Sequence, residues 1–186
     1  MSKTYSKTRI LVECALMIAI GTVLSNIKFF TLPNGGSVTL LSMLPFVLVS
    51  FRHGVKWGLF TGFVNSLLQM LLGFYAPPAP GLLPLVGMIL LDYVLAFGVM
   101  GIAGLGRGKP HGIFWGSVLG GAARFVVHYI SGITIYKILA PTEIFGTVFD
   151  NPALYSLIYN GSYVGIDLVL CLVIFGILYA PLKKYM

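Results

Sequence analysis

The chain has 186 residues, of which 58% are hydrophobic and only 9% are charged, and its formal net charge is +7. Soluble domains carry about 25% charged residues, so this composition excludes a water-soluble globular protein. The basic residues form no patch with interleaved aromatic side chains, which argues against a nucleic-acid-binding protein.

Six apolar segments follow one another and nearly exhaust the length of the chain. A membrane-spanning helix needs about 20 apolar residues. The first segment is too long for a cleavable signal peptide, and no small-residue cleavage site follows it. We therefore expect one all-α integral membrane domain, residues 1–186, with six transmembrane helices. Their approximate spans are 8–27, 38–51, 55–73, 82–105, 112–138 and 153–182.

Basic residues mark one side of this predicted bundle. Only Lys28 and Lys137 fall at the boundaries of the other side, and Arg124 lies within a segment. Short basic connections remain in the cytoplasm, so we expect both termini to be cytoplasmic. The residues on which this orientation depends are Lys3, Lys7, Arg9, Arg52, Lys56, Arg107, Lys109, Lys183 and Lys184.

The connections on the opposite side are longer and less charged. Residues 29–37 contain the turn sequence Pro-Asn-Gly-Gly, residues 75–81 are too rich in proline to be helical, and residues 140–152 hold two acidic groups. Such loops suit the mouth or cover of a site, although simple linkers would have the same composition.

Two features of the segments concern packing. Pro45 predicts that the short second segment is bent or spans only partly. Ala15 and Ala19 lie four residues apart and expose a groove for a second helix, either inside the protein or on a partner. Cys14 and Cys171 match no metal or redox spacing, so they are interpreted as packing residues and no cofactor is expected.

Among the ionisable and amide groups within the apolar segments, five carry the argument for an internal site. A charge at bilayer depth costs roughly 2.5–3.5 kcal/mol, so such groups mark a pair, a polar cavity or a binding site. Arg124, His128 and Ser131 share one helix face. Asp92 is the natural partner of Arg124 in a buried ion pair. That pair could also serve only to fix helix register. The five groups are Asp92, Arg124, His128, Asn160 and Asp167.

Tyrosines gather at the same depth as these polar groups. Their ring faces stack on heteroaromatic rings and attract cations, while Asn160 and His128 offer donors and acceptors. A carboxylate such as Asp92 favours a cation. Together these residues predict a small cationic or amide-bearing heterocycle as the ligand.

Four motifs resemble the thiamine-specific S-components (ThiT/YuaJ type) of energy-coupling-factor (ECF) transporters. The resemblance covers nearly the whole chain and implies a six-helix subunit of the bacterial plasma membrane that captures thiamine from outside. It also implies a transmembrane coupling subunit and two cytoplasmic ATPases as partners. The motifs are Pro33-Asn34-Gly35-Gly36-Ser37-Val38-Thr39, Leu91-Asp92-Tyr93, His128-Tyr129-Ile130-Ser131-Gly132 and Tyr155-Ser156-Leu157-Ile158-Tyr159-Asn160.

The resemblance also implies roles for individual residues. One departure is Gly36, where some relatives have Trp, so that either another aromatic such as Phe30 covers the ligand or the cover is less tight. Ala15 and Ala19 correspond to the family's contact with its coupling subunit. The implied substrate-binding residues are Asp92, Tyr93, Arg124, His128, Tyr136, Tyr155, Asn160 and Tyr75.

Other functions remain open at this stage. A self-sufficient ion-coupled carrier would bind the same kind of solute, although no internal repeat supports it. An intramembrane enzyme is another alternative, but the sequence contains neither a nucleophile elbow nor a metal-spaced histidine pair. A structural membrane adaptor is a third alternative, and it would bind no ligand. The sequence does not distinguish thiamine from its phosphates or pyrimidine precursors, nor a dedicated ATPase module from a shared one.

Overall fold

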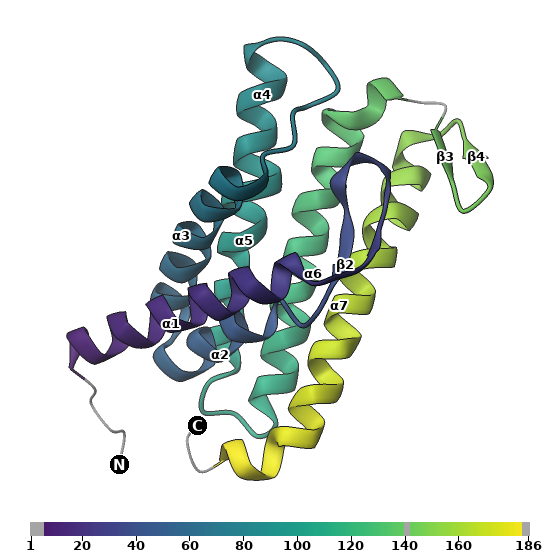
Figure 1. The fold of residues 1–186 in the computed structure, drawn as a ribbon. Helices are drawn as coiled ribbons and strands as arrows, with labels where there is room; N and C mark the ends of the chain where they lie inside the picture. The colour runs from purple at the N-terminus through teal and green to yellow at the C-terminus, as the bar shows by residue number, and fades with distance from the viewer. Residues whose placement is uncertain (1–5, 140–141, 184–186) are drawn as a thin grey trace.

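The computed structural model describes residues 6–139 and 142–183, which are mostly helical (Figure 1). Lys3 and Lys184, used in the charge argument, lie outside these residues. Within them, two short antiparallel hairpins join the helices: β1 (Lys28–Thr31) with β2 (Ser37–Thr39), and β3 (Thr142–Ile144) with β4 (Thr147–Phe149). The six helical segments are α1 (Lys7–Asn26), α2 (Leu44–His53), α3 (Val55–Gly73), a composite helix Leu82–Gly106, α6 (Gly112–Thr134) and α7 (Pro152–Lys183).

Four of the described helices are long and apolar enough to cross a membrane: α1, Leu82–Gly106, α6 and Pro152–Pro181 within α7. The other two segments differ from simple spans. With 10 residues, α2 is about 15 Å long, half the roughly 30 Å of the hydrocarbon core. With 19 residues α3 has the length, but Asn65 and Gln69 make it more polar.

The second predicted segment, 38–51, begins later in the structure than expected. Residues 38 and 39 belong to β2, Leu41 adopts a positive φ of 59°, and the helix starts only at Leu44. Pro45 therefore lies in the first helical turn, where its missing N–H has no intrahelical partner to lose. The proline starts this helix and does not bend it.

The fourth segment changes its helical type along its length. It comprises α4 (Leu82–Met88), the π-helix η2 (Ile89–Leu95), α5 (Ala96–Gly98) and the 3-10 helix η3 (Val99–Gly106). A π turn inside a longer helix is frequent at functional sites. Here it carries Asp92 and Tyr93.

The basic connections gather at one end of the bundle. His111 stacks on Tyr179 near the end of α7, with ring centroids 5.7 Å apart. The side chain of Arg107 packs beside Gly54 in the turn between α2 and α3. Glu13 of α1 joins the same end through an ion pair with Arg52, at 3.2 Å between Nη1 and Oε2.

The opposite end holds the hairpins and the proline-rich connection (Figure 1). The first loop turns where predicted, with positive φ angles at Asn34 (62°) and Gly35 (90°). Phe30 and Phe145 link the two hairpins by stacking at 6.4 Å between ring centroids. This end of the bundle contains the cavity described below.

Candidate functional site

A cavity of about 270 Å³ opens among the loops and helices at the hairpin end. It is lined by the β1–β2 turn, the connection after α3, the π-helix, α6 and α7. All eight residues that the sequence predicted for substrate binding line this cavity: Tyr75, Asp92, Tyr93, Arg124, His128, Tyr136, Tyr155 and Asn160. The structure brings them together, while the part that each takes in binding stays a prediction.

Asp92 is bonded to α6, but not to the residue predicted. Its Oδ1 lies 2.9 Å from Nδ1 of His128, and its Oδ2 accepts a 2.6 Å hydrogen bond from the hydroxyl of Ser131. The predicted ion pair between Asp92 and Arg124 is therefore wrong. Arg124 lies four residues before His128, which is about 6 Å along the axis of α6. The two oxygens of Asp92 instead contact the turns that carry His128 and Ser131.

Arg124 is buried without a carboxylate partner in the described part of the chain. Its side chain lies over the ring of Phe97, with the guanidinium carbon 5.2 Å from the ring centroid. The residue is 8% exposed, and its Nε and Nη1 have no hydrogen-bond partner among the described residues. Buried donors of this kind are costly unless an acceptor reaches them. Arg124 can thus hold an oxygen or nitrogen acceptor of a ligand in the cavity.

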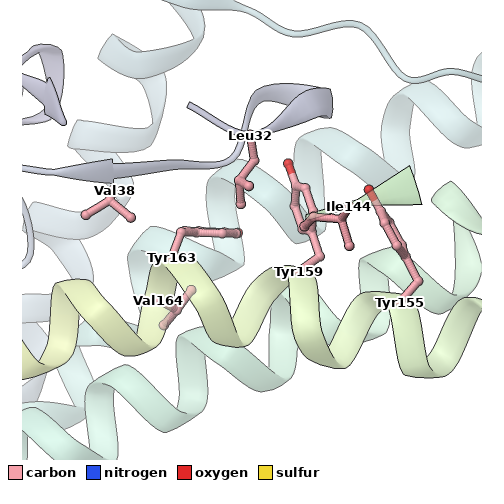
Figure 2. Packing of buried hydrophobic residues seen from close by; sticks show 7 residues of the cluster. All are labelled: Leu32, Val38, Ile144, Tyr155, Tyr159, Tyr163 and Val164. Atoms are coloured by element: carbon pink, nitrogen blue, oxygen red, sulfur yellow. The ribbon is translucent and has the colours of Figure 1, made fainter. Parts of the chain in front are cut away.

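Three tyrosines and one amide form the α7 wall of the cavity. Figure 2 shows Tyr155, Tyr159 and Tyr163 rising from α7 toward the first loop, where Leu32 lies above them. Asn160 is held between them, since its Nδ2 donates to the Ser156 carbonyl at 2.9 Å and its Oδ1 accepts from Tyr163 at 3.0 Å. Its remaining acceptor capacity is available to a ligand.

Tyr159 fastens the first loop over the cavity. The backbone N–H of Gly36 donates to its hydroxyl at 2.8 Å, and the hydroxyl donates to the Pro33 carbonyl. Nearby, the Asn34 amide donates to the Tyr155 hydroxyl at 3.4 Å. Position 36 must be glycine in this arrangement, because a Cβ there would lie 2.5 Å from the Tyr159 hydroxyl oxygen.

Two tyrosines, and not Phe30, lie against the glycines of the first loop. Phe30 is 51% exposed, stacks on Phe145 and is not among the residues that line the cavity, so the suggestion that it covers the ligand is wrong. Tyr75 lies against Gly35, where a Cβ would be 3.3 Å from its ring, and Tyr159 lies against Gly36. These two tyrosines occupy the space under and beside the loop.

Gly36→Ala should loosen this cover. Inserting a methyl group into a well-packed position costs about 1–3 kcal/mol, so the contact of the loop with Tyr159 should open roughly tenfold more often. Amide hydrogen exchange of residues 34–37 measures this opening. Gly176→Ala is the matched control, because a Cβ there meets nothing within 4 Å. Unchanged exchange in Gly36→Ala would show that Tyr159 does not hold the loop.

A second tyrosine hydroxyl fastens the connection after α3. The backbone N–H of Tyr75 donates to the Tyr93 hydroxyl at 2.9 Å, and this hydroxyl donates to the Gly73 carbonyl at 3.3 Å.

Burial raises the pKa of the Tyr136 phenol, which lies just after α6 in η4 (Tyr136–Leu139). That phenol therefore stays protonated and able to donate at neutral pH.

Asp167 has a different surrounding from the other polar groups. It is 1% exposed and does not line the cavity. Its carboxylate accepts from the backbone N–H of Thr39 at 2.9 Å and from the Thr39 hydroxyl at 3.0 Å. It thereby binds the end of β2 to α7, which is a structural task.

The sequence reasoning missed several cavity residues. They include Ser25, Lys28, Ser42 and Gln69, which stand singly at helix ends or in loops. Isolated polar residues at such places are ordinary for a membrane protein, so nothing in the pattern singled them out. Ser131 was placed on the face of His128 but was not predicted to bind Asp92.

Taken together, fold and cavity define a multi-pass helical membrane protein with an internal polar cavity. The sequence matches the family described as Thiamine transporter protein (Thia_YuaJ) over residues 11–186, and the chain belongs to that family. Members of this class are transporters of the bacterial membrane, not enzymes, as the sequence predicted.

Curated relatives and a solved structure agree with this assignment. The chain is 32% identical to the thiamine transporter ThiT of Bacillus subtilis (strain 168), over 91% of this chain and 89% of the relative. It is 30% identical to ThiT of Lacticaseibacillus paracasei, over 91% and 86%. The structure of ThiT from Listeria monocytogenes has the same fold, with a TM-score of 0.77 at 23% identity, over 96% of this chain and 97% of that chain.

Proposed function

We propose that this protein is the thiamine-binding S-component of an ECF-type importer. It captures thiamine at the hairpin end and delivers it inward together with a transmembrane coupling subunit and two cytoplasmic ATPases. The observation that carries the proposal is the cavity itself, in which Asp92 and His128 form a hydrogen-bonded pair next to a wall of tyrosines. A thiazolium cation and an aminopyrimidine ring match a carboxylate, aromatic faces and amide groups.

The test is calorimetry of the purified protein with thiamine, followed by uptake in cells with and without the coupling module. Saturable binding and uptake that needs the module support the proposal. Absence of binding would contradict the choice of ligand. Uptake in cells that lack the module would instead favour a self-sufficient ion-coupled carrier.

The proposed orientation places both termini and the basic end in the cytoplasm, with six crossings. The gathering of Arg52, Arg107 and His111 at one end supports it, because positively charged connections are retained inside.

The exposed face of α1 is proposed as the contact with the coupling subunit. Ala15 and Ala19 lie on this face, whereas Cys14, Ile18 and Gly21 turn toward the bundle.

Cysteine labelling in intact cells checks the orientation. Cys14 and Cys171 are buried, at 1% and 0% exposure, so a single introduced cysteine is the reactive one. Val148→Cys, in the second hairpin, should react with a membrane-impermeant maleimide. Lys109→Cys, at the basic end, should react only after the membrane is permeabilised. The reverse pattern would invert the proposed topology.

A further inference from the structure

The cavity has a wall without aromatic side chains on the side of α1 and α3. Ser25 lies near the end of α1, Lys28 begins β1, and Gln69 lies near the end of α3. All three line the same cavity as Asp92 and the α7 tyrosines. This wall therefore offers hydroxyl, amide and ammonium groups where the opposite wall offers rings.

Hydrogen bonds between the two helices hold this wall in place. Gln69 donates through Nε2 to the Ser25 hydroxyl oxygen at 2.8 Å, and that hydroxyl donates to the Thr22 carbonyl at 2.8 Å. One turn deeper, the Thr22 hydroxyl donates to Asn65, which is fully buried, at 3.5 Å. The Ser25 proton is thus engaged, whereas Oε1 of Gln69 accepts no hydrogen bond from the described residues.

We propose that Ser25, Lys28 and Gln69 form a subsite for the oxygen-bearing tail of the ligand, while the aromatic wall holds its rings. This inference rests on the proposed function, since thiamine carries a hydroxyethyl tail on its thiazolium ring. A hydroxyl group can donate to Oε1 of Gln69 and accept from the Lys28 ammonium. A phosphate ester of the same tail accepts only, and it would bind the ammonium more strongly.

Lys28 gives this wall of the cavity a positively charged side chain at the hairpin end of the bundle. Lys137, the other lysine at that boundary, does not line the cavity. The Asp92 carboxylate belongs to the ring-binding part, where it is bonded to His128 and Ser131. A ligand with a cationic ring and a polar or anionic tail would therefore have a complementary partner at each end.

The experiment is a set of calorimetric titrations of the purified full-length protein. The ligands are thiamine, its analogue with an ethyl group in place of the hydroxyethyl tail, and thiamine monophosphate. Gln69→Leu removes the amide at nearly constant size, Lys28→Met removes the ammonium, and Lys137→Met is the matched control outside the cavity. Titrations at low and high salt isolate the contribution of charge.

Gln69→Leu should weaken thiamine roughly tenfold and leave the ethyl analogue within about twofold, because only the hydroxyl loses a partner. Lys28→Met should weaken thiamine monophosphate most, and high salt should reduce that difference. Lys137→Met should change none of the three affinities. Equal losses for thiamine and the ethyl analogue would mean that Gln69 only supports the α1–α3 contact, and the subsite would be refuted. A wild-type protein that binds none of the three ligands would instead refute the proposed function.

Discussion

Asp92→Asn is expected to lower thiamine affinity by about 30-fold or more. The carboxylate binds both His128 and Ser131, and an amide offers only one acceptor oxygen to these two groups. The substitution also removes the negative charge that is proposed to face the thiazolium cation. Removing the charged partner of a hydrogen-bonded pair costs about 2–5 kcal/mol, which is roughly 30- to several thousand-fold in affinity. Calorimetry of the purified variant measures the loss.

Asp150→Asn is the matched control, because this acidic residue is exposed and does not line the cavity. A second comparison tests the observed pairing directly. Since Arg124 does not contact Asp92, adding Arg124→Gln should not rescue Asp92→Asn. An unchanged affinity in Asp92→Asn would remove the residue from the binding site, and rescue by Arg124→Gln would contradict the geometry of the cavity.

Replacing Ala15 and Ala19 by Trp should abolish uptake and spare binding. Both alanines are exposed on α1, and bulky side chains at such positions prevent the close approach of a second helix. Uptake in cells that carry the coupling module should fall by more than about tenfold, a loss of over 1.4 kcal/mol in coupling. Thiamine affinity of the isolated protein should stay within about threefold, because neither alanine lines the cavity.

Val169→Trp is the control for this variant, since it adds the same bulk to an exposed site on α7. It should leave both binding and uptake near the wild-type values. Normal uptake in the Ala15→Trp, Ala19→Trp variant would mean that this face of α1 touches no partner. Equal losses of binding and uptake would identify the alanines as packing positions within the protein.

The sequence was sufficient to predict the helical segments because apolar length determines them. The turn at residues 33–36 and the non-helical connection at 75–81 were also predicted, since glycine and proline restrict the backbone there. The late start of α2 was not, because Leu41 needs a left-handed conformation that no local pattern indicates. No local sequence pattern indicated the π-helix at Asp92 either.

Eight of the residues that line the cavity were predicted, but their contacts with one another were not. Helical spacing placed Arg124, His128 and Ser131 on one face, and all three line the cavity. Charge alone favoured Arg124 as the partner of Asp92. In the structure, the axial position of the Leu82–Gly106 helix relative to α6 places Asp92 beside His128 and Ser131 instead. The spacing of charges does not encode this axial offset, which is accompanied by close glycine contacts between the two helices, such as Gly116 against Ala103 and Gly120 against Met100.

The hydroxyl of Tyr159 bonds to main-chain atoms of the first loop, the amide of Gly36 and the carbonyl of Pro33. Main-chain atoms of this kind are supplied by almost any residue, so the side chains of the loop can change through evolution without loosening it. The stability of the closed loop depends instead on the Tyr159 hydroxyl of α7, whose position does not change when the loop sequence changes. Exchange of loops between relatives should therefore preserve the rate at which the cavity opens, provided that position 36 stays glycine and α7 keeps its tyrosine.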